Sequence, residues 1–228
     1  DGHYHGWIDN VLGGKRQESS DAPPHATENS ADPMHTEGRS TTAYQESFKL
    51  PWNDIDVLRK VLEKYEDQIA LVLMEGVMTN GGCCIPKPGY LQQVRELCTK
   101  HNVVFCMDEV ITGFRMGLGG AQEHYNVVPD LATFGKAIAG GMPLAAVAGK
   151  AEIFELLRTN RVVGAGTFNA APLSMSAGLA TMHMLAKDGN AAYQRIDAMQ
   201  RQFMSEFRLL AKKYQQKVLV QGVRGVFC

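Results

Sequence analysis

The sequence has no CxxC pair, and its five cysteines (Cys83, Cys84, Cys98, Cys106 and Cys228) are odd in number. A structural zinc site normally needs a second pair of ligands, so structural zinc is not expected and no metal site is predicted. Cysteines of this number and spacing favour reduced thiols over a disulfide framework. We therefore expect an intracellular protein.

Long apolar runs and an excess of one charge are also absent. No segment approaches the roughly 20 apolar residues that a membrane span needs. Lys and Arg number 23 against 24 Asp and Glu, a net charge of −1, which favours neither a nucleic-acid nor a membrane partner. A cytoplasmic location is expected. The chain starts at Asp1 without a methionine, so we expect a piece of a longer protein, and an organelle targeting peptide stays open.

Aliphatic residues are scarce between positions 18 and 50, where Ser, Asp, Pro and Thr dominate. Such a segment buries too little apolar surface to form a core, so 18–50 is predicted to be a polar surface loop or insert. The whole chain is 45% hydrophobic and can bury a sizeable core. We assign 1–17 and 51–187 to a large domain, and 188–228 to a linking helix and the start of a smaller, truncated C-terminal domain.

From Pro51 onward, strand-like and helix-like patterns alternate. Strands are predicted at IALVLME (69–75), VVFCMDE (103–109), DLATFG (130–135) and PLAAVAG (143–149). Helices are predicted at 53–67, 89–101, 151–158 and 171–187. The alternation predicts an α/β architecture with a largely parallel sheet, in which ligands collect at the carboxyl ends of the strands.

A long helix is predicted after position 187. Apolar residues recur along it at three- and four-residue steps: Ile196, Met199, Phe203, Phe207, Leu210 and Tyr214. We expect this stripe to pack in the core. The closing segment, 217–228, is predicted to be strand again.

Three polar residues stand at the ends of predicted strands: Glu75, Asp108 and Lys136. The strand before Asp108 reads as buried on both faces, so the carboxylate loses hydration at a cost unless a cation meets it. Lys136 lies between a strand and a glycine-rich turn, where a lysine often simply points to solvent. If apolar neighbours desolvate its amine instead, the amine becomes nucleophilic and can form a Schiff base with a carbonyl.

A Schiff-base lysine paired with a buried acid on a neighbouring strand suggests pyridoxal 5′-phosphate. The ring nitrogen of this cofactor needs a carboxylate to stay protonated, because only the cationic ring is a strong electron sink. The pyridinium would then be the cation that Asp108 meets.

The segments MDEVITGFR, FGKAIAGGMP and GTFNAAPLSMSAG resemble the class III pyridoxal-phosphate-dependent aminotransferases. YHGWID, PWND and IPKPGYLQQVREL are similar to the glutamate-1-semialdehyde aminomutase-like branch of that family. The resemblance covers nearly the whole chain except the polar insert. It implies the large domain of a fold type I transferase, a mainly parallel sheet flanked by helices, with 51–187 binding the cofactor. Family members match only from their middle onward, so the chain looks truncated at both ends.

The resemblance also implies roles for individual residues. Lys136 would form the Schiff base, and Asp108 would bind the ring nitrogen. Val110, expected on the same strand face as Asp108, would pack against one face of the ring. Tyr4 would stack on the other face with His5 close by, although without the resemblance Tyr4 reads as an ordinary half-buried aromatic.

Two further residues are predicted to bind the cofactor. Thr167 resembles the threonine that binds the cofactor phosphate across a dimer interface, so a homodimer is expected. Without the resemblance, Thr167 reads as a helix N-cap. Asn80 stands where many family members that act on γ- or δ-amino substrates carry a glutamate, which favours the aminomutase-like branch.

The predicted function is transfer of an amino group between an amine or amino acid and an oxo acid or aldehyde, with Lys136 also moving the proton. One alternative is a 2,1-aminomutase, which returns the amine to the adjacent carbon of the same molecule. Another is a truncated, inactive member that retains only fold and dimer contacts. Nucleotide-dependent chemistry is not favoured, because GAGTFN lacks the third glycine of a dinucleotide-binding turn and no P-loop spacing is present.

Overall fold

The computed structural model describes residues 2–12, 15–16 and 46–228, so residues 18–45 of the predicted polar loop lie outside the described residues. The chain divides into two compact units. Unit 1 comprises Asp1–Ala70 and Pro86–Val103, and unit 2 comprises Leu71–Ile85 and Val104–Cys228. The predicted domain boundaries after residues 17, 50 and 187 stay predictions.

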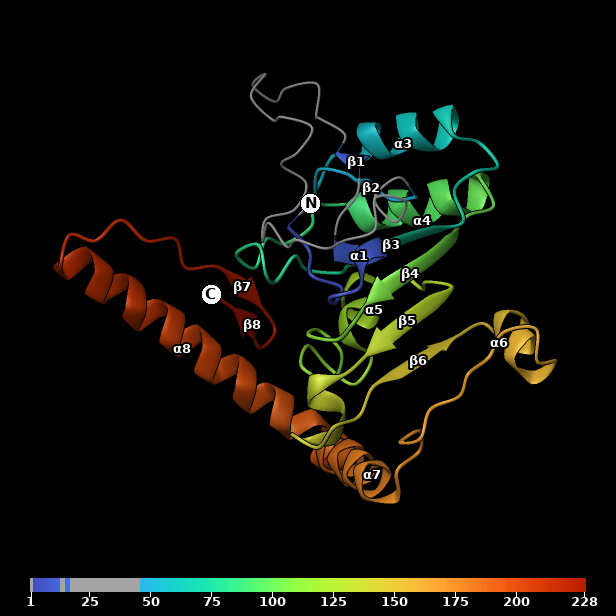
Figure 1. The fold of residues 1–228 in the computed structure, drawn as a ribbon. Helices are drawn as coiled ribbons and strands as arrows, with labels where there is room; N and C mark the ends of the chain where they lie inside the picture. Colours follow the sequence, from blue (N-terminus) through green and yellow to red (C-terminus); the bar gives the residue numbers. More distant parts are fainter. Residues whose placement is uncertain (1, 13–14, 17–45) are drawn as a thin grey trace. The chain divides into compact units, whose positions relative to one another are not determined.

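Unit 1 contains two longer helices, α3 (Ile55–Lys64) and α4 (Tyr90–Lys100) (Figure 1). α3 begins at the predicted cap, because the Asp54 carboxylate accepts a hydrogen bond from the Val57 N–H at 3.2 Å. The two helices contact each other. They bury Val57, Leu58, Val61, Leu62, Tyr90, Leu91, Val94, Leu97 and Cys98. The unit also contains α1 (Asp9–Leu12) and the parallel pair β1 (Lys15–Arg16) and β2 (Phe48–Lys49).

Unit 2 is built on a four-stranded sheet (Figure 1). Its strands, in spatial order, are β3 (Leu71–Glu75), β4 (Val104–Asp108), β5 (Leu131–Phe134) and β6 (Ala146–Gly149). β3, β4 and β5 run parallel, and β6 pairs with β5 in the antiparallel sense. The predicted α/β class with a largely parallel sheet is therefore confirmed.

β4 is an inner strand of this sheet, and it is apolar until its last residue. Phe105 and Met107 are fully buried, as expected for a parallel strand that is covered on both faces. The register aligns Glu75 with Asp108, and Asp108 with Thr133. Three polar residues from neighbouring strands therefore lie side by side at the carboxyl edge of the sheet.

The helices of unit 2 are α5 (Gly120–Tyr125), α6 (Ala151–Arg158), α7 (Pro172–Ala186) and α8 (Ala191–Lys213), with the short 3-10 helices η1 (Lys136–Ala139) and η2 (Lys187–Asn190). α5 and the 3-10 helices have no counterpart among the predicted helices, whereas the others form where expected. α7 and α8 are separated by Asp188 and Gly189, whose φ values of 53° and 61° break the helix.

The closing segment 217–228 is only partly strand. It forms a short antiparallel hairpin of β7 (Gly222–Val223) and β8 (Val226–Phe227). A Cβ at Gly222 (φ 153°) would lie 2.3 Å from the Val226 carbonyl oxygen, so this hairpin closes only around a glycine. The predicted strand is interrupted at Arg224 and Gly225, whose φ values of 46° and 75° form the turn between β7 and β8.

The prediction that the apolar stripe of α8 packs in the core is wrong. Met199, Phe203 and Tyr214 are 60%, 51% and 63% exposed. α8 instead buries Tyr193, Gln200 and Met204. Periodicity identifies an amphipathic helix, but it does not say which residues cover the apolar face. Among the described helices, none combines the length and apolar composition that crossing a bilayer requires.

Asp130 joins the start of β5 to β4. It is 6% exposed, and its carboxylate accepts the Phe105 N–H at 2.7 Å and pairs with Lys150 Nζ at 2.8 Å. We expect Asp130→Ala to lower the free energy of unfolding by about 3 kcal/mol, because it leaves a buried N–H and an ammonium without this partner. Urea unfolding measures the change.

Glu152 provides a matched control for that substitution. Its exposed carboxylate lies 3.9 Å from the same Lys150 Nζ. An exposed ion pair contributes little, so Glu152→Ala is expected to change the free energy of unfolding by less than about 1 kcal/mol. Equal losses in the two variants would contradict a special role for the buried contact.

The five cysteines are free, but they differ in burial. Burial, followed by a hydrogen bond with Cys228, raises the pKa of Cys83 to about 12. Burial also raises the pKa of Cys106 to about 11. Because the thiolate is the reactive form, iodoacetamide at pH 8 is expected to label the exposed Cys228 and to leave Cys83 and Cys106 unmodified. Peptide mass spectrometry checks this, and alkylation of Cys83 ahead of Cys228 in the folded protein would refute it.

Candidate active site

Asp108 ends β4 at the carboxyl edge of the sheet and is 8% exposed. Its register partners are Glu75 on β3 and Thr133 on β5. The carboxyl edge of a parallel sheet is where open α/β folds bind ligands. A carboxylate at this place keeps its charge only if polar or cationic groups meet it, which makes Asp108 a candidate for contact with a cationic ligand group.

Val110 lies two residues beyond the end of β4, in a turn, so the expectation that it shares a strand face with Asp108 is wrong. The turn forms because Asp108 Oδ1 accepts the Val110 N–H at 2.9 Å. The Val110 side chain nevertheless reaches the next strand connection. A Cβ added to Gly135 would lie 3.3 Å from Val110 Cγ1. The structure thus brings Val110 against the residue that precedes Lys136.

Lys136 begins η1 with a φ of 45°. A left-handed backbone is uncommon for lysine, and residues held this way concentrate at functional sites. The expectation that apolar neighbours desolvate the amine is not met, because Lys136 is exposed among the described residues. The turn that follows, at Gly140 and Gly141, has no side chains with which to cover it.

The Glu75 side chain holds the loop that follows β3 against the end of that strand. The residue is 4% exposed, and its Oε2 accepts the Thr79 N–H at 2.7 Å and the Thr79 hydroxyl at 2.6 Å. Its Oε1 accepts a hydrogen bond from Asn80 Nδ2 at 3.3 Å. Asn80 is therefore held near the carboxyl edge of the sheet, and its role toward a cofactor stays a prediction.

Thr167 lies in the connection between α6 and α7 and is exposed. The alternative that it caps a helix is wrong, because the N-cap of α7 is Ala171, four residues later. Thr167 is thus available to bind a group from outside the described residues.

Tyr4 and His5 belong to unit 1. Both are half-buried. The Tyr4 ring contacts Trp7 edge to face with 5.8 Å between centroids, and the His5 ring contacts His3 at 5.5 Å. Their roles against a cofactor ring stay predictions.

Glu109 is a functional candidate that the sequence reasoning missed. It follows Asp108 directly and is fully buried. Its carboxylate accepts hydrogen bonds from the Thr112 hydroxyl, from the Ala121 N–H at 3.0 Å and from the Gln122 N–H at 2.9 Å. The available signal was an acid immediately after a buried strand, with a threonine three residues later.

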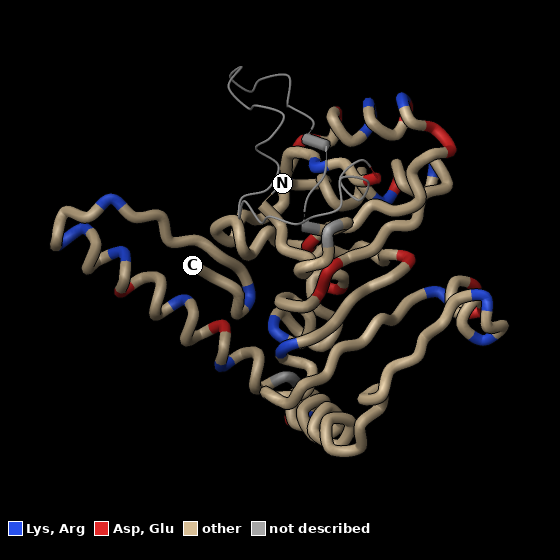
Figure 2. The backbone as a smooth tube through the Cα atoms, viewed as in Figure 1, with Lys and Arg blue, Asp and Glu red and all other residues tan. Residues whose placement is uncertain are grey.

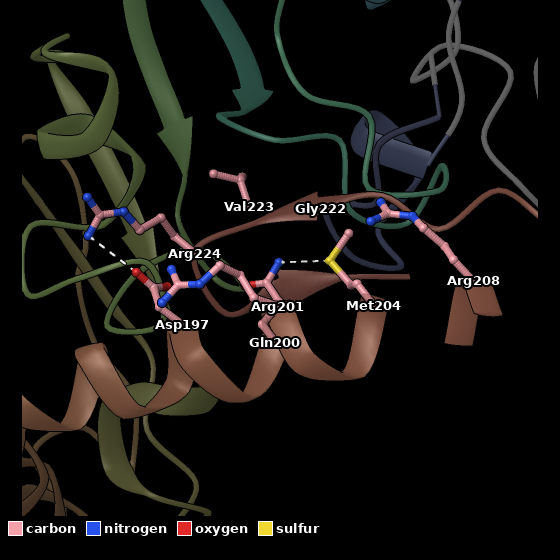
Figure 3. Close-up of a pocket in the computed structure, with 8 residues that line it drawn as sticks. All are labelled: Asp197, Gln200, Arg201, Met204, Arg208, Gly222, Val223 and Arg224. Carbon is pink, nitrogen blue, oxygen red and sulfur yellow. Dashed lines mark hydrogen bonds and ion pairs between the residues drawn. The ribbon is translucent and has the colours of Figure 1, made fainter. Parts of the chain in front are cut away.

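A separate groove of about 330 Å³ lies between α8 and the β7–β8 hairpin (Figure 3). Arg224 and Asp197 form an ion pair at 3.7 Å at one end, and Arg208 donates a hydrogen bond to the Val220 carbonyl at 2.5 Å. The groove contains none of the predicted site residues. The candidate site is therefore the carboxyl edge of the sheet, not this groove.

Comparison with known proteins identifies relatives along the whole chain. The sequence model of the family Aminotransferase class-III matches residues 1–228. A glutamate-1-semialdehyde 2,1-aminomutase of Methanocaldococcus jannaschii is 36% identical over 228 residues, which are 100% of this chain and 51% of that protein. Glutamate-1-semialdehyde 2,1-aminomutase 2 of Lachnoclostridium phytofermentans is 38% identical over 192 residues, 84% of this chain and 45% of that protein. The chain therefore spans about half the length of the curated relatives it matches.

Solved structures give a consistent result. An omega-transaminase from Sphaerobacter thermophilus superposes with a TM-score of 0.84 at 31% identity, over 98% of this chain and 50% of that one. A structure described as a transaminase with PLP bound superposes with a TM-score of 0.80 at 26% identity, again over 98% of this chain and 50% of that one. Both likenesses extend across the sheet edge where Asp108 and Lys136 lie.

Proposed function

Because this chain belongs to the class-III aminotransferases, we propose that it binds pyridoxal 5′-phosphate at the carboxyl edge of its sheet and transfers amino groups. The observation that carries the proposal is the register of β4 with β5, which aligns Asp108 with Thr133, three residues before Lys136. The residues present fit the cofactor: a buried carboxylate suits the ring nitrogen, and an exposed amine suits the aldehyde. Val110 adds an apolar side chain next to the backbone that leads to the amine.

Each residue has a distinct role in this proposal. Asp108 would bind the protonated ring nitrogen, Val110 would pack against one ring face, and Lys136 would hold the aldehyde carbon. Thr167 would bind the phosphate of a neighbouring subunit's cofactor. The family resemblance further implies cofactor contacts for Tyr4, His5 and Asn80.

The bound cofactor supplies an electron sink that stabilises negative charge at the substrate carbon. Lys136 acts as general base and acid, taking the proton from the substrate carbon and returning it. The Asp108 carboxylate beside the ring nitrogen would favour the protonated ring. The Asp108–Val110 turn holds that carboxylate in one orientation, because the Val110 N–H binds Oδ1.

A 2,1-aminomutase reaction is the second candidate. Asn80 lies where many family members with γ- or δ-amino substrates have a glutamate, and relatives named as aminomutases match up to the whole chain. Both reactions use the same ring and lysine, and they differ in whether the amine leaves on a product or returns to the adjacent carbon of the same molecule. Incubation with an aminated substrate and an isotopically labelled oxo acid distinguishes them, because only an aminotransferase converts the labelled oxo acid into a labelled amino acid.

Cofactor trapping tests the proposal directly. The purified chain is incubated with pyridoxal 5′-phosphate, reduced with borohydride and digested. We expect one added phosphopyridoxyl mass, on the peptide that contains Lys136. Pyridoxine 5′-phosphate, which has no aldehyde, serves as the control and is expected to add none. Absence of binding at excess cofactor would instead support an inactive chain that retains fold and dimer contacts.

A homodimer is the proposed assembly. α7 follows Thr167 and has no Lys, Arg, Asp or Glu, as its uniform colour in Figure 2 indicates. It exposes Leu173, Met175, Leu179 and Met184, and the connection before it exposes Phe168 at 86%. Contiguous exposed apolar surface of this kind marks protein interfaces, and a second copy of the chain would cover it in a two-fold dimer. Light scattering that gives only the monomer mass would count against the dimer.

A further inference from the structure

Glu109 links three parts of unit 2 at the edge of the candidate site. Its carboxylate binds the first N–H groups of α5, at Ala121 and Gln122, and the hydroxyl of Thr112. Its own backbone N–H donates to the Thr133 carbonyl at 2.9 Å, and its carbonyl accepts the Gly113 N–H at 2.8 Å. Glu109 is therefore held through both its backbone and its side chain, between Asp108 and Val110.

Gly120 leaves space for this carboxylate because it has no side chain. It has a φ of 63°, and a Cβ built on it would lie 2.5 Å from Glu109 Oε2. No side chain larger than hydrogen fits there without moving the acid. The glycine lets the carboxylate come within hydrogen-bond distance of the Ala121 and Gln122 amides.

We propose that Glu109 is a positioning residue for the cofactor: by fastening the turn to α5, its carboxylate fixes the orientation of Asp108 and Val110. This inference rests on the proposed function. The turn 109–113 has its own hydrogen bonds, but among the hydrogen bonds of the described residues only those of the Glu109 side chain connect it to α5. Loss of the carboxylate frees the turn, so the Asp108 carboxylate and the Val110 side chain no longer keep one orientation.

Glu109→Gln tests the inference because it keeps the size of the side chain and removes its charge. A glutamine amide nitrogen would face at least one of the amide donors, so one bond is lost. We expect the dissociation constant for pyridoxal 5′-phosphate to rise about ten-fold in the folded variant. Glu123→Gln is the matched control on the same helix, since the exposed Glu123 carboxylate accepts a single hydrogen bond among the described residues, from the Gly119 N–H at 3.1 Å. The control is expected to bind the cofactor as the unaltered chain does.

Hydrogen exchange in the cofactor-free protein supplies a second readout. Glu109→Gln is expected to speed exchange in the peptides that cover 108–114 and 119–125, whereas Glu123→Gln is expected to affect only the second. Should Glu109→Gln fail to fold, Thr112→Val removes one of the three bonds and keeps the carboxylate with its two amide donors. It is expected to weaken cofactor binding two- to three-fold, less than loss of the carboxylate does.

These outcomes distinguish failure of the positioning role of Glu109 from failure of the proposed function. Cofactor affinity unchanged in Glu109→Gln, with only a lower unfolding temperature, would overturn the inference and make Glu109 a purely structural cap. Absence of cofactor binding in the unaltered chain would overturn the proposed function. In that case the exchange experiment still decides whether Glu109 fastens the turn.

Discussion

Lys136→Ala is expected to abolish the visible absorbance band of bound pyridoxal 5′-phosphate and to lower the rate of amino transfer at least about 10⁴-fold. The substitution removes both the amine that holds the aldehyde and the group that moves the proton, and each function alone contributes several powers of ten. The fold should survive, because the Lys136 side chain is exposed and its removal leaves no buried cavity. Absorbance titration and a coupled transfer assay measure the two effects.

Lys212→Ala is the control for that substitution. Lys212 is an exposed lysine in the last turn of α8. It is distant from Lys136 in the sequence and belongs to a different element. Its removal is expected to leave the band and the rate unchanged. A band that persists in Lys136→Ala and disappears in another lysine variant would move the covalent link elsewhere and refute the assignment.

Asp108→Asn is expected to slow amino transfer by about 10²- to 10³-fold, the range that follows loss of one well-placed electrostatic partner. An asparagine oxygen can still accept the Val110 N–H, so the turn is preserved and the change is mainly one of charge. Without the carboxylate, the ring nitrogen loses its proton and the ring becomes a weaker electron sink. The measurement is the rate of the first half-reaction, followed by the disappearance of the cofactor band.

A cofactor analogue tests whether Asp108→Asn slows amino transfer through the proton on the ring nitrogen. With a carbon in place of the ring nitrogen, no proton remains for Asp108 to stabilise, so the unaltered chain and Asp108→Asn are expected to react at the same slow rate. Asp130→Asn, which alters another buried aspartate of the sheet, is expected to reduce stability without this effect on the rate. A large difference between the first two proteins when both hold the analogue would show that Asp108 acts otherwise.

The sheet and its polar edge were predictable because each strand carries its own signal. IALVLME and VVFCMDE are short apolar runs that end in acids, and parallel strands place those ends together. Val110 was misplaced because a two-residue period was extended past the strand. The Asp108 side chain captures the Val110 N–H and starts a turn instead, a competition that strand periodicity does not include.

The environment of Lys136 and the face of α8 were predicted less well, for a common reason. Both predictions concern what covers a residue, and cover depends on segments distant in sequence. The glycines at 140 and 141 leave Lys136 exposed, and the described residues leave Phe203 and Tyr214 half or more exposed on α8. Glu109 was missed because its partners, Ala121 and Gln122, lie more than ten positions away and belong to a helix too short to be predicted.

The division of the chain has a consequence for any attempt to take the protein apart. The backbone passes from unit 1 to unit 2 at residue 71, returns at 86 and crosses again at 104. No single cut separates the two units: a break before Leu71 leaves α4 of unit 1 on the fragment that carries unit 2, and a break before Val104 separates β3 from its partner strand β4. Isolating either body would require splicing two stretches together with a linker.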